Sequence, residues 1–263
     1  MSANFGIMDT KNATKINQLI SQWPKGAVFT QKYLSQMEYY HALVKTYKKG
    51  KWIEPIGSGA YKLYRDEVDW YGGLYALQKQ LNLKVHAGGR TALELKGYAH
   101  YLRPGEQVCY LFGSAVEKLP KWFTDYDWGV RIIYKATNLL PKDLTRSFSE
   151  YSHKEFTVTI SSPERAALEM LYYVPSKQGY DEASKIMESL LSLRPEIVEE
   201  LLERCNSVKV KRLFLYIAEK HKLPWFTKLN LDRVDLGSGK RVIVENGVLD
   251  KKYKITVPAE RAF

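Results

Sequence analysis

Residues 26–64 read GAVFTQKYLSQMEYYHALVKTYKKGKWIEPIGSGAYKLY, and this stretch sets the architecture of the amino-terminal region. Thr30 can cap a short helix through its hydroxyl. A second helix is predicted from Glu38 to Lys48, and it stops at Gly50. Two short apolar runs then flank residues 57–59, Gly-Ser-Gly, a turn signal for a β-hairpin. Helix, helix and hairpin in this order predict a winged helix-turn-helix.

The charge of the chain is unevenly distributed. The formal net charge is +11 over 263 residues, and residues 1–65 hold ten Lys and Arg against three Asp and Glu. A small basic region attracts polyanions through counterion release, and nucleic acid is the commonest such partner. A solvated basic surface that only aids solubility is the alternative. On a helix-helix-hairpin pattern, the charge favours double-stranded DNA.

The second helix supplies the most concrete contacts. Leu43 and Tyr47 lie four residues apart and are predicted to face the core. His41, Lys45 and Lys48 fall at i, i+4 and i+7, so they share another face that can enter the major groove.

Residues around this helix complete the predicted interface. Tyr39 and Tyr40 are expected in its first turn, with one of the two in the core. Gln31 and Lys32 begin the preceding helix and are expected at phosphate, and further lysines in and before the wing add backbone contacts. The predicted DNA-binding set is Gln31, Lys32, Tyr39, Tyr40, His41, Lys45, Lys48, Lys49, Lys51 and Lys62. If the basic face is an ordinary one, the domain is instead a protein-binding adaptor that does not bind DNA.

The chain is predicted to divide after residue 65, where Asp66-Glu67-Val68-Asp69 interrupts the pattern. The expected class is α+β, with a winged helix-turn-helix in residues 1–65 and a mixed α/β domain in residues 66–263. A first helix is predicted over 10–21. In the second domain, a helix is predicted over 68–81, where Leu74, Leu77 and Leu81 recur at helical spacing, and another over 90–95, closed by Gly97. Further helices are predicted over 163–174, 180–191, 195–204 and 207–221. The predicted strands are 98–102, 107–112, 129–134 and 155–160, with a hairpin near the end that turns at 245–247.

Composition narrows the compartment and the chemistry. There are 45% hydrophobic residues and only two cysteines, Cys109 and Cys205, with no Cys/His cluster. This predicts a packed protein without structural zinc, in a reducing cytoplasm. We find no apolar leader and no stretch of eighteen apolar residues, so no membrane partner is expected. No cofactor is predicted.

One motif suggests an enzyme. Gly113-Ser114 is followed by Asp125-Tyr126-Asp127, as in nucleotidyltransferases, where two aspartates hold magnesium for phosphoryl transfer. Such a fold needs a helix directly after the Gly-Ser turn, and Lys118-Leu119-Pro120 leaves little room for one. A nucleotidyltransferase using Asp125 and Asp127 is therefore the alternative to a protein without catalytic residues.

Five sequence blocks resemble those of the AbiEi-type antitoxins. In order along the chain they are HAGGRTALELKG (86–97), LPKW (119–122), SPERA (162–166), VKVKRLFL (208–215) and GSGKR (237–241). The likeness runs from about residue 10 to Pro258. It implies an antitoxin and autorepressor of a type IV toxin–antitoxin system, the abortive-infection kind that defends against phage. The winged helix would bind inverted repeats in its own promoter, and a nucleotidyltransferase toxin would be countered without direct contact.

The same resemblance implicates basic residues of the second domain in contact with DNA or in antitoxin action. These are Arg90, Lys209, Lys211, Arg212, Lys240 and Arg241. Helical spacing places Lys209 and Arg212 together on an exposed face of the 207–221 helix. Pairing of these cations with the acidic helix Glu196-Glu199-Glu200-Glu203 is an equally weighted alternative.

Overall fold

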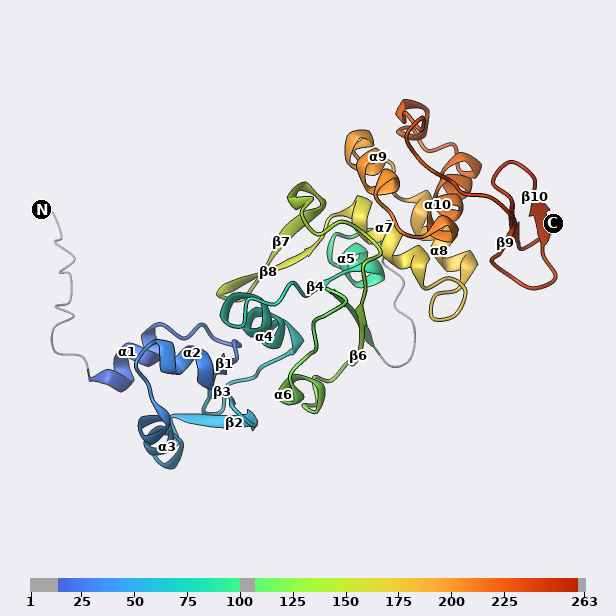
Figure 1. The fold of residues 1–263 in the computed structure, drawn as a ribbon. Coiled ribbons are helices and arrows are strands. Elements are labelled where there is room, and N and C mark those ends of the chain that lie inside the picture. The colour runs from blue at the N-terminus through green and yellow to red at the C-terminus, as the bar shows by residue number, and fades with distance from the viewer. Residues whose placement is uncertain (1–13, 100–106, 260–263) are drawn as a thin grey trace, which may run out of the picture. The chain divides into compact units, whose positions relative to one another are not determined.

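The computed structural model describes residues 14–99 and 107–259, which form helices and small sheets of mixed α+β class (Figure 1). Two compact units are present. Unit 1 comprises Met1–Asn82, Leu119–Trp128 and Ser152–Phe156, and unit 2 comprises Leu83–Lys118, Gly129–Tyr151 and Thr157–Phe263. By packing, residues 66–82 therefore belong with the amino-terminal segment. The division after residue 65 stays a prediction.

Unit 1 begins with the predicted helices and hairpin, and it adds one strand that was not predicted, β1, directly before the helix that begins at Gln31. Its elements are α1 (Lys15–Ser21), β1 (Phe29–Thr30), α2 (Gln31–Gln36), α3 (His41–Lys49), β2 (Ile53–Gly57), β3 (Ala60–Leu63), α4 (Trp70–Tyr75), the π-helical turn η2 (Ala76–Gln80) and α6 (Lys121–Thr124). The strands form one sheet in the order β1-β3-β2, antiparallel throughout. The first residues of the predicted 10–21 helix lie outside the described residues.

A side-chain cap marks the start of α2, and a left-handed residue precedes the start of α3. The Thr30 hydroxyl accepts a hydrogen bond from the Tyr33 N–H at 3.2 Å, so the predicted cap of α2 is confirmed. The predicted start of the next helix at Glu38 is wrong. Glu38 has a φ of +65°, a left-handed conformation that breaks the helix, and α3 starts three residues later.

The β2–β3 hairpin forms where the Gly-Ser-Gly signal predicts it. Ile53 pairs with Leu63 and Pro55 with Tyr61, and the turn places Gly59 at a φ of +75°. β1 then joins the free side of β3. The buried Gln80 side chain fixes β1, because it accepts from the Thr30 N–H at 2.8 Å and donates to the Val28 carbonyl at 2.7 Å.

Two adjacent glycines let α4 pack closely against the rest of unit 1. A Cβ at Gly72 would lie 1.9 Å from the Gly26 carbonyl oxygen, and one at Gly73 would lie 2.7 Å from the Trp128 ring. The single helix predicted over 68–81 is instead the α-helix α4 followed directly by η2. η2 is π-helical, so its turn is wider than that of an α-helix. Leu74 and Leu77 are fully buried, as their spacing predicts.

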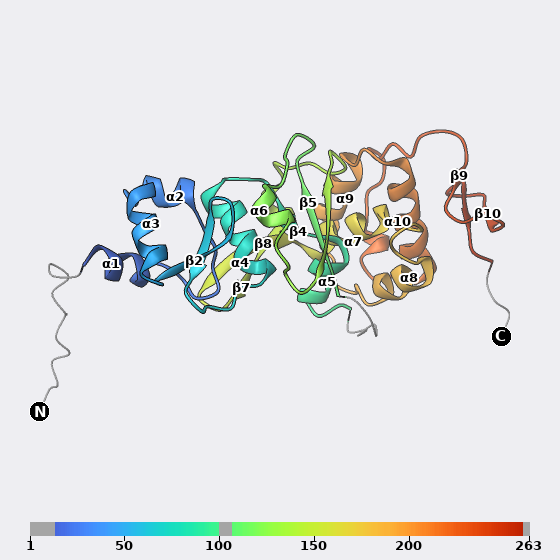
Figure 2. The ribbon, with the colours of Figure 1, turned by 90° about the horizontal axis from the view of Figure 1, so that it is seen from below.

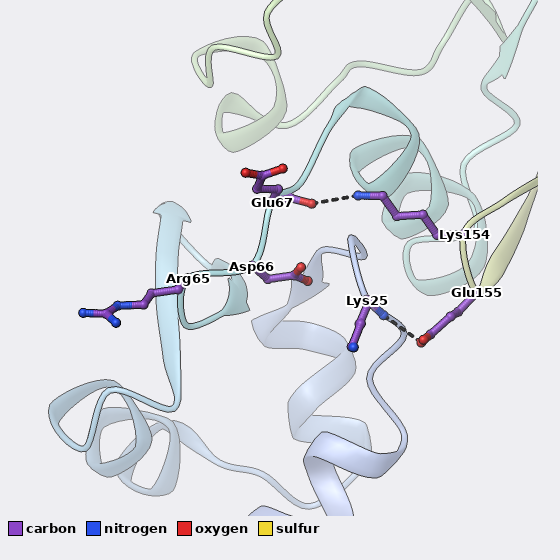
Figure 3. A pocket seen from close by; sticks show the side chains of 6 residues that line it. All are labelled: Lys25, Arg65, Asp66, Glu67, Lys154 and Glu155. Carbon is purple, nitrogen blue, oxygen red and sulfur yellow. Dashed lines mark hydrogen bonds between the residues drawn. The ribbon is translucent and has the colours of Figure 1, made fainter.

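Two later stretches of chain complete unit 1. Trp122 and Phe123 of α6 are buried, and Gly57 of β2 lies so close to Trp122 that a Cβ there would approach its Cβ to 2.7 Å. The second stretch, Ser152–Phe156, places the His153 ring on Tyr71 with centroids 4.1 Å apart. Lys154 donates to the Glu67 carbonyl at 3.0 Å, and the Glu155 carboxylate accepts from the Lys25 N–H at 3.0 Å (Figure 3).

Unit 2 is built on a five-stranded sheet in the order β6-β5-β4-β8-β7. The strands are β4 (His86–Ala87), β5 (Val108–Gly113), β6 (Arg131–Ala136), β7 (Phe148–His153) and β8 (Phe156–Ser161), the last two joined by the segment that belongs to unit 1. β5 runs parallel to β6 and antiparallel to β4, and β4 runs parallel to β8. The sequence predicted β5, β6 and β8 within two residues and missed β7.

The helices of unit 2 follow the predicted order (Figure 2). They are α5 (Gly89–Leu95), α7 (Pro163–Tyr172), α8 (Tyr180–Glu188), α9 (Pro195–Glu203) and α10 (Val208–Lys220), with short 3-10 turns η3 (Thr145–Ser147) and η4 (Phe226–Lys228). α5 is closed by Gly97 at a φ of +82°, as predicted. Of the predicted strand 98–102, residues 98 and 99 are not in a strand and the rest lies outside the described residues.

The carboxyl-terminal strands differ from the predicted hairpin. They are β9 (Arg241–Val242), β10 (Val248–Asp250) and β11 (Ile255–Val257). The chain turns at Asn246, whose φ is +56°, but β9 and β10 do not pair with each other. β11 lies between them, parallel to β9 and antiparallel to β10, and its residues Ile255 and Val257 are buried.

Candidate nucleic-acid interface

Helix α3 presents a basic face to solvent. His41, Lys45 and Lys48 are exposed, and within the described ranges none of the three has an ion-pair partner. The Lys48 ammonium lies 5.9 Å from the centroid of the Tyr61 ring in β3. Three cationic or titratable groups thus share one face of a nine-residue helix without an internal counter-charge.

A neighbouring face of α3 is its core side. Val44 and Tyr47 are 2% and 7% exposed, whereas Leu43 is half-buried. The predicted core pair is therefore right for Tyr47, but Val44 and not Leu43 is its buried partner on the helix. Burial raises the pKa of Tyr47, with Tyr39 nearby adding to the shift.

Tyr39 and Tyr40 precede α3, so their predicted place in its first turn is wrong. Tyr40 has an extended backbone and occupies the N-cap position of α3, but its side chain makes no capping hydrogen bond. Tyr39 is buried, donates from its hydroxyl to the Lys15 carbonyl at 3.1 Å, and has its pKa raised by that burial. Tyr40 is 62% exposed, so of the two it is the tyrosine that a ligand can contact.

The remaining lysines of the predicted interface divide into free and paired ones. Lys32, Lys49 and Lys51 are exposed, and Lys51 has a φ of +54° just after the end of α3. Lys62 is different, because its ammonium contacts the Glu54 carboxylate at 3.1 Å and donates to the Asp66 carbonyl at 2.8 Å. The Lys62 charge is therefore already neutralised by contacts within β2, β3 and the following turn.

Gln31 does not lie at a surface where it can touch phosphate. It is 8% exposed, and its amide donates to the Ser35 hydroxyl and the Tyr39 carbonyl while accepting from the Tyr61 hydroxyl. A buried amide with these partners fixes α2 against β3. We therefore correct its assignment from a phosphate contact to a structural residue.

The basic residues of unit 2 singled out by the resemblance are mostly engaged. Arg90 pairs with Glu94 at 2.5 Å and Glu182 at 2.7 Å. Lys209 is half-buried and donates to the Tyr172 and Val174 carbonyls at 3.1 and 2.6 Å, and its burial lowers its pKa.

Arg212 and Lys211 are buried, at 1% and 5% exposed, so the predicted exposed face shared by Lys209 and Arg212 is wrong. The Arg212 guanidinium donates to four backbone carbonyls, those of Leu236, Gly237, Gly239 and Lys254. It therefore organises the loop that carries Lys240 and Arg241, both of which are exposed.

The acidic helix α9 pairs with other cations than those predicted. Glu200 contacts Arg146 at 3.1 Å and Arg204 at 3.3 Å, and Glu203 pairs with Arg233. Lys209, Lys211 and Arg212 make none of these contacts. The alternative in which α9 neutralises the basic residues of α10 is thus not what the structure has.

The residues of the enzyme-like motif lie in different settings. Ser114 donates from its backbone N–H to Glu117 at 2.9 Å, and no helix covers residues 115–120. Gly113 and Ser114 belong to unit 2, whereas Asp125 and Asp127 are exposed residues of unit 1. Across residues 14–99 and 107–259 there is no group of three or more His, Cys, Asp or Glu side chains suited to a metal ion.

A buried ionic network in unit 2 escaped the sequence analysis. Glu169 of α7 is 2% exposed and accepts from His86 and Arg165, each at 2.9 Å, from the Gly89 N–H at 3.0 Å and from the Ser161 hydroxyl at 2.6 Å. Burial opposes the charged carboxylate, but His86, Arg165 and Ser161 together lower the pKa of Glu169. The signal that points to it is Arg165 and Glu169 at i and i+4 in a helix whose other residues are mostly apolar.

A charged depression of about 550 Å³ lies within unit 1 (Figure 3). Its lining mixes both signs in equal number: Lys25, Arg65, Asp66, Glu67, Lys154 and Glu155. The Asp66 carboxylate accepts from the Gly26 N–H at 2.7 Å, which anchors the wall. Because the charges offset one another, this depression favours neither an anion nor a cation.

The comparisons with known proteins place these two units in a family. Residues 106–258 match the family described as "Transcriptional regulator, AbiEi antitoxin, Type IV TA system", and residues 12–104 match its amino-terminal domain. The chain belongs to the AbiEi antitoxin family of transcriptional regulators. The resemblance seen in the sequence blocks is therefore confirmed.

A solved structure shares the fold. The RV2827C protein from Mycobacterium tuberculosis is similar with a TM-score of 0.62 and 13% identity, over 91% of this chain and 88% of that chain. At this identity the likeness concerns the fold alone. No curated protein matches the chain. Among the described helices, none has the length and apolar character needed to cross a bilayer.

Proposed function

We propose that this regulator represses its own operon by binding inverted repeats in the promoter through a winged helix-turn-helix in unit 1. The order α1, β1, α2, α3, β2, β3, with a β1-β3-β2 sheet, supports this assignment. In it, α3 is the recognition helix and the β2–β3 hairpin is the wing. The observation that carries the proposal is the exposed face of His41, Lys45 and Lys48, which has no internal counter-charge.

The contacts within this proposal follow from exposure. His41 and Lys45 are assigned to base edges in the major groove, and Lys48 to phosphate. Exposed Lys32, Lys49 and Lys51 add phosphate contacts, and Tyr40 lies where the chain enters α3. Lys62 is left to a minor role, because its ammonium is already paired with Glu54.

We further propose that the part of the chain beyond residue 65 counters a nucleotidyltransferase toxin without binding it directly. The family match supports an antitoxin of a type IV system. In this proposal the antitoxin and the toxin are linked by their opposing effects and not by direct binding. Phage defence by abortive infection is the expected setting. Of the six basic residues that the resemblance singled out in unit 2, Lys240 and Arg241 are exposed and accessible to a partner. They lie on the loop that Arg212 organises.

A gel-shift assay with the DNA upstream of the gene tests the DNA-binding part. Wild-type protein should retard this DNA and not a shuffled sequence, with an affinity that falls steeply as salt rises. The variant H41A/K45A/K48A should lose retardation. Its matched control is K79A/K121A, which removes the same formal lysine charge from exposed positions of unit 1. Equal binding by both variants would remove α3 from the interface.

Co-expression tests the antitoxin part. The neighbouring gene should arrest growth when expressed alone, and this protein should restore growth. H41A/K45A/K48A should still restore it when both genes are driven from unrelated promoters, because repression is then irrelevant. A neighbour that is harmless by itself would refute the antitoxin assignment and leave the DNA-binding proposal to the gel-shift.

A further inference from the structure

Three lysines of unit 2 surround a pair of tyrosines at the end of α7. The Lys135 and Lys209 ammonium groups lie 5.3 and 5.9 Å from the centroid of the Tyr172 ring. The Lys177 ammonium lies 5.6 Å from the centroid of Tyr173, whose ring centre is 5.7 Å from that of Tyr172. The lysines come from β6, from the segment after α7 and from α10, so the fold gathers them at one place.

None of these three ammonium groups meets a carboxylate in the described part of the chain. Elsewhere the same unit pairs its cations closely: Arg90 with two glutamates, Arg165 with Glu169, Arg194 with Glu164. The lysines around Tyr172 instead contact aromatic rings and, for Lys209, backbone carbonyls. Cation–π contacts contribute only about 0.5–1 kcal/mol each at exposed sites. Because no carboxylate of the described chain neutralises these lysines, an external anion can.

The surface between the lysines is partly apolar. Tyr110, Phe112 and Tyr173 form a buried cluster, and Val108, Ile133 and Tyr172 pack against it while remaining partly exposed. β6 is an edge strand of the five-stranded sheet, and five of its six residues are half-buried. Positive charge beside accessible aromatic and aliphatic surface is the combination that single-stranded nucleic acid binds, with phosphates at the lysines and unstacked bases on the apolar groups.

We propose that Lys135 and Lys177, with Tyr172 and Ile133, form a binding site for single-stranded nucleic acid in unit 2, beside the half-buried Lys209 that holds the end of α7. A duplex can use only the charges, because its bases are stacked away from an apolar surface. A single strand can use both. This site goes beyond operator binding and uses none of the residues assigned to the winged helix.

Fluorescence anisotropy with a labelled single-stranded oligonucleotide tests the site. Wild-type protein should bind it with a salt slope that reports the phosphate contacts, and K135Q/K177Q should reduce that slope by about 1.4, since each contact with a single strand contributes about 0.7. Lys209 is left in place because it also holds the end of α7. Y172L should weaken binding about fivefold or more if a base stacks there.

The matched control is K228Q/K251Q, which removes two exposed lysines of the same unit. It should leave the slope unchanged, with thermal unfolding showing that all variants fold. RNA and DNA strands of one sequence distinguish the two possible sources of the phosphate chain. H41A/K45A/K48A should still bind the single strand, so failure of operator binding would not affect this result.

Three results would overturn the proposal. One is a salt slope for K135Q/K177Q equal to that of the wild type. The second is equal binding of duplex and single strand by H41A/K45A/K48A, in which the proposed duplex-binding face of α3 is removed. The third is displacement by poly-glutamate as effective as by unlabelled oligonucleotide. Either of the last two would mean that the lysines respond to charge alone.

Discussion

Replacement of Glu169 by glutamine should destabilise unit 2 strongly, although the two side chains have nearly the same shape and size. The carboxylate receives four hydrogen bonds, two at each oxygen: His86 and Arg165 at Oε1, and Gly89 N–H and Ser161 at Oε2. An amide offers one accepting oxygen and one donating NH₂. Whichever way it is oriented, at least one fixed donor of the network faces another donor.

The size of the effect can be worked from these contacts. If the NH₂ replaces Oε2, Ser161 can rotate to accept but the Gly89 N–H is left unpaired, which costs about 1–3 kcal/mol. The substitution also removes the only carboxylate that pairs with Arg165 among the described residues, and Arg165 is 4% exposed. Breaking a buried ion pair by removing one partner costs about 3–5 kcal/mol. Because the two losses overlap, we expect about 3–5 kcal/mol in total.

Urea unfolding followed by circular dichroism measures the loss, and hydrogen exchange of peptides from α5 and α7 locates it in unit 2. The control is E200Q, which removes a carboxylate paired with Arg146 and Arg204 at the surface. Such pairs contribute about 0–1 kcal/mol. If E169Q and E200Q lose the same stability, the reasoning about the buried network is refuted.

Three further outcomes are expected. G72A should cost about 3 kcal/mol or more in thermal unfolding, since its Cβ would meet the Gly26 carbonyl at 1.9 Å. G179A meets nothing within 4 Å and should cost only about 1 kcal/mol, because Gly179 is the N-cap of α8 and alanine is a poorer cap. Q31L should lose about 1–3 kcal/mol by urea unfolding because the Tyr61 hydroxyl and Tyr39 carbonyl lose their partner; a loss no larger than that of K32A would contradict this. The folded-state pKa of Glu169 lies below the ordinary 4.5, so the unfolded chain binds more protons between the two values. The contribution of Glu169 to stability is full above about pH 4.5 and is lost as the pH falls through the lower value. The difference in the free energy of unfolding between wild type and E169Q, measured in urea titrations, should therefore narrow as the pH falls. A difference that stays constant would contradict the assignment.

Local signals in the sequence predicted the fold where local chemistry decides it. Thr30, the Gly-Ser-Gly turn and Gly97 act within a few residues of themselves, and each was predicted correctly. β7 was missed because its residues, FSEYSH, carry no apolar alternation and half-buried positions alternate with exposed ones. The start of α3 was missed because Glu38 adopts a left-handed φ that nothing in its neighbours requires.

For the candidate interface, too, the sequence predicted only what depends on neighbouring residues. Helical spacing correctly placed His41, Lys45 and Lys48 on an exposed face. It could not show that Gln31 and Arg212 are buried. Gln31 contacts Tyr61 30 residues away, and the carbonyls that Arg212 contacts lie 24 to 42 residues away. Whether a polar side chain is a surface group or a structural one depends on contacts that only the tertiary fold creates.

The discontinuous make-up of unit 1 has a consequence for how the protein is synthesised. Its amino-terminal part needs Trp122, Phe123 and Trp128 for packing, and the last contributing stretch ends at Phe156. At about 5–20 residues per second, roughly 4 to 15 s pass on the ribosome between residue 82 and that point. A nascent chain interrupted in this interval carries α3 but lacks the two later stretches that complete unit 1. The unit that we propose to silence the operon is therefore complete only once more than half of the antitoxin itself has been made.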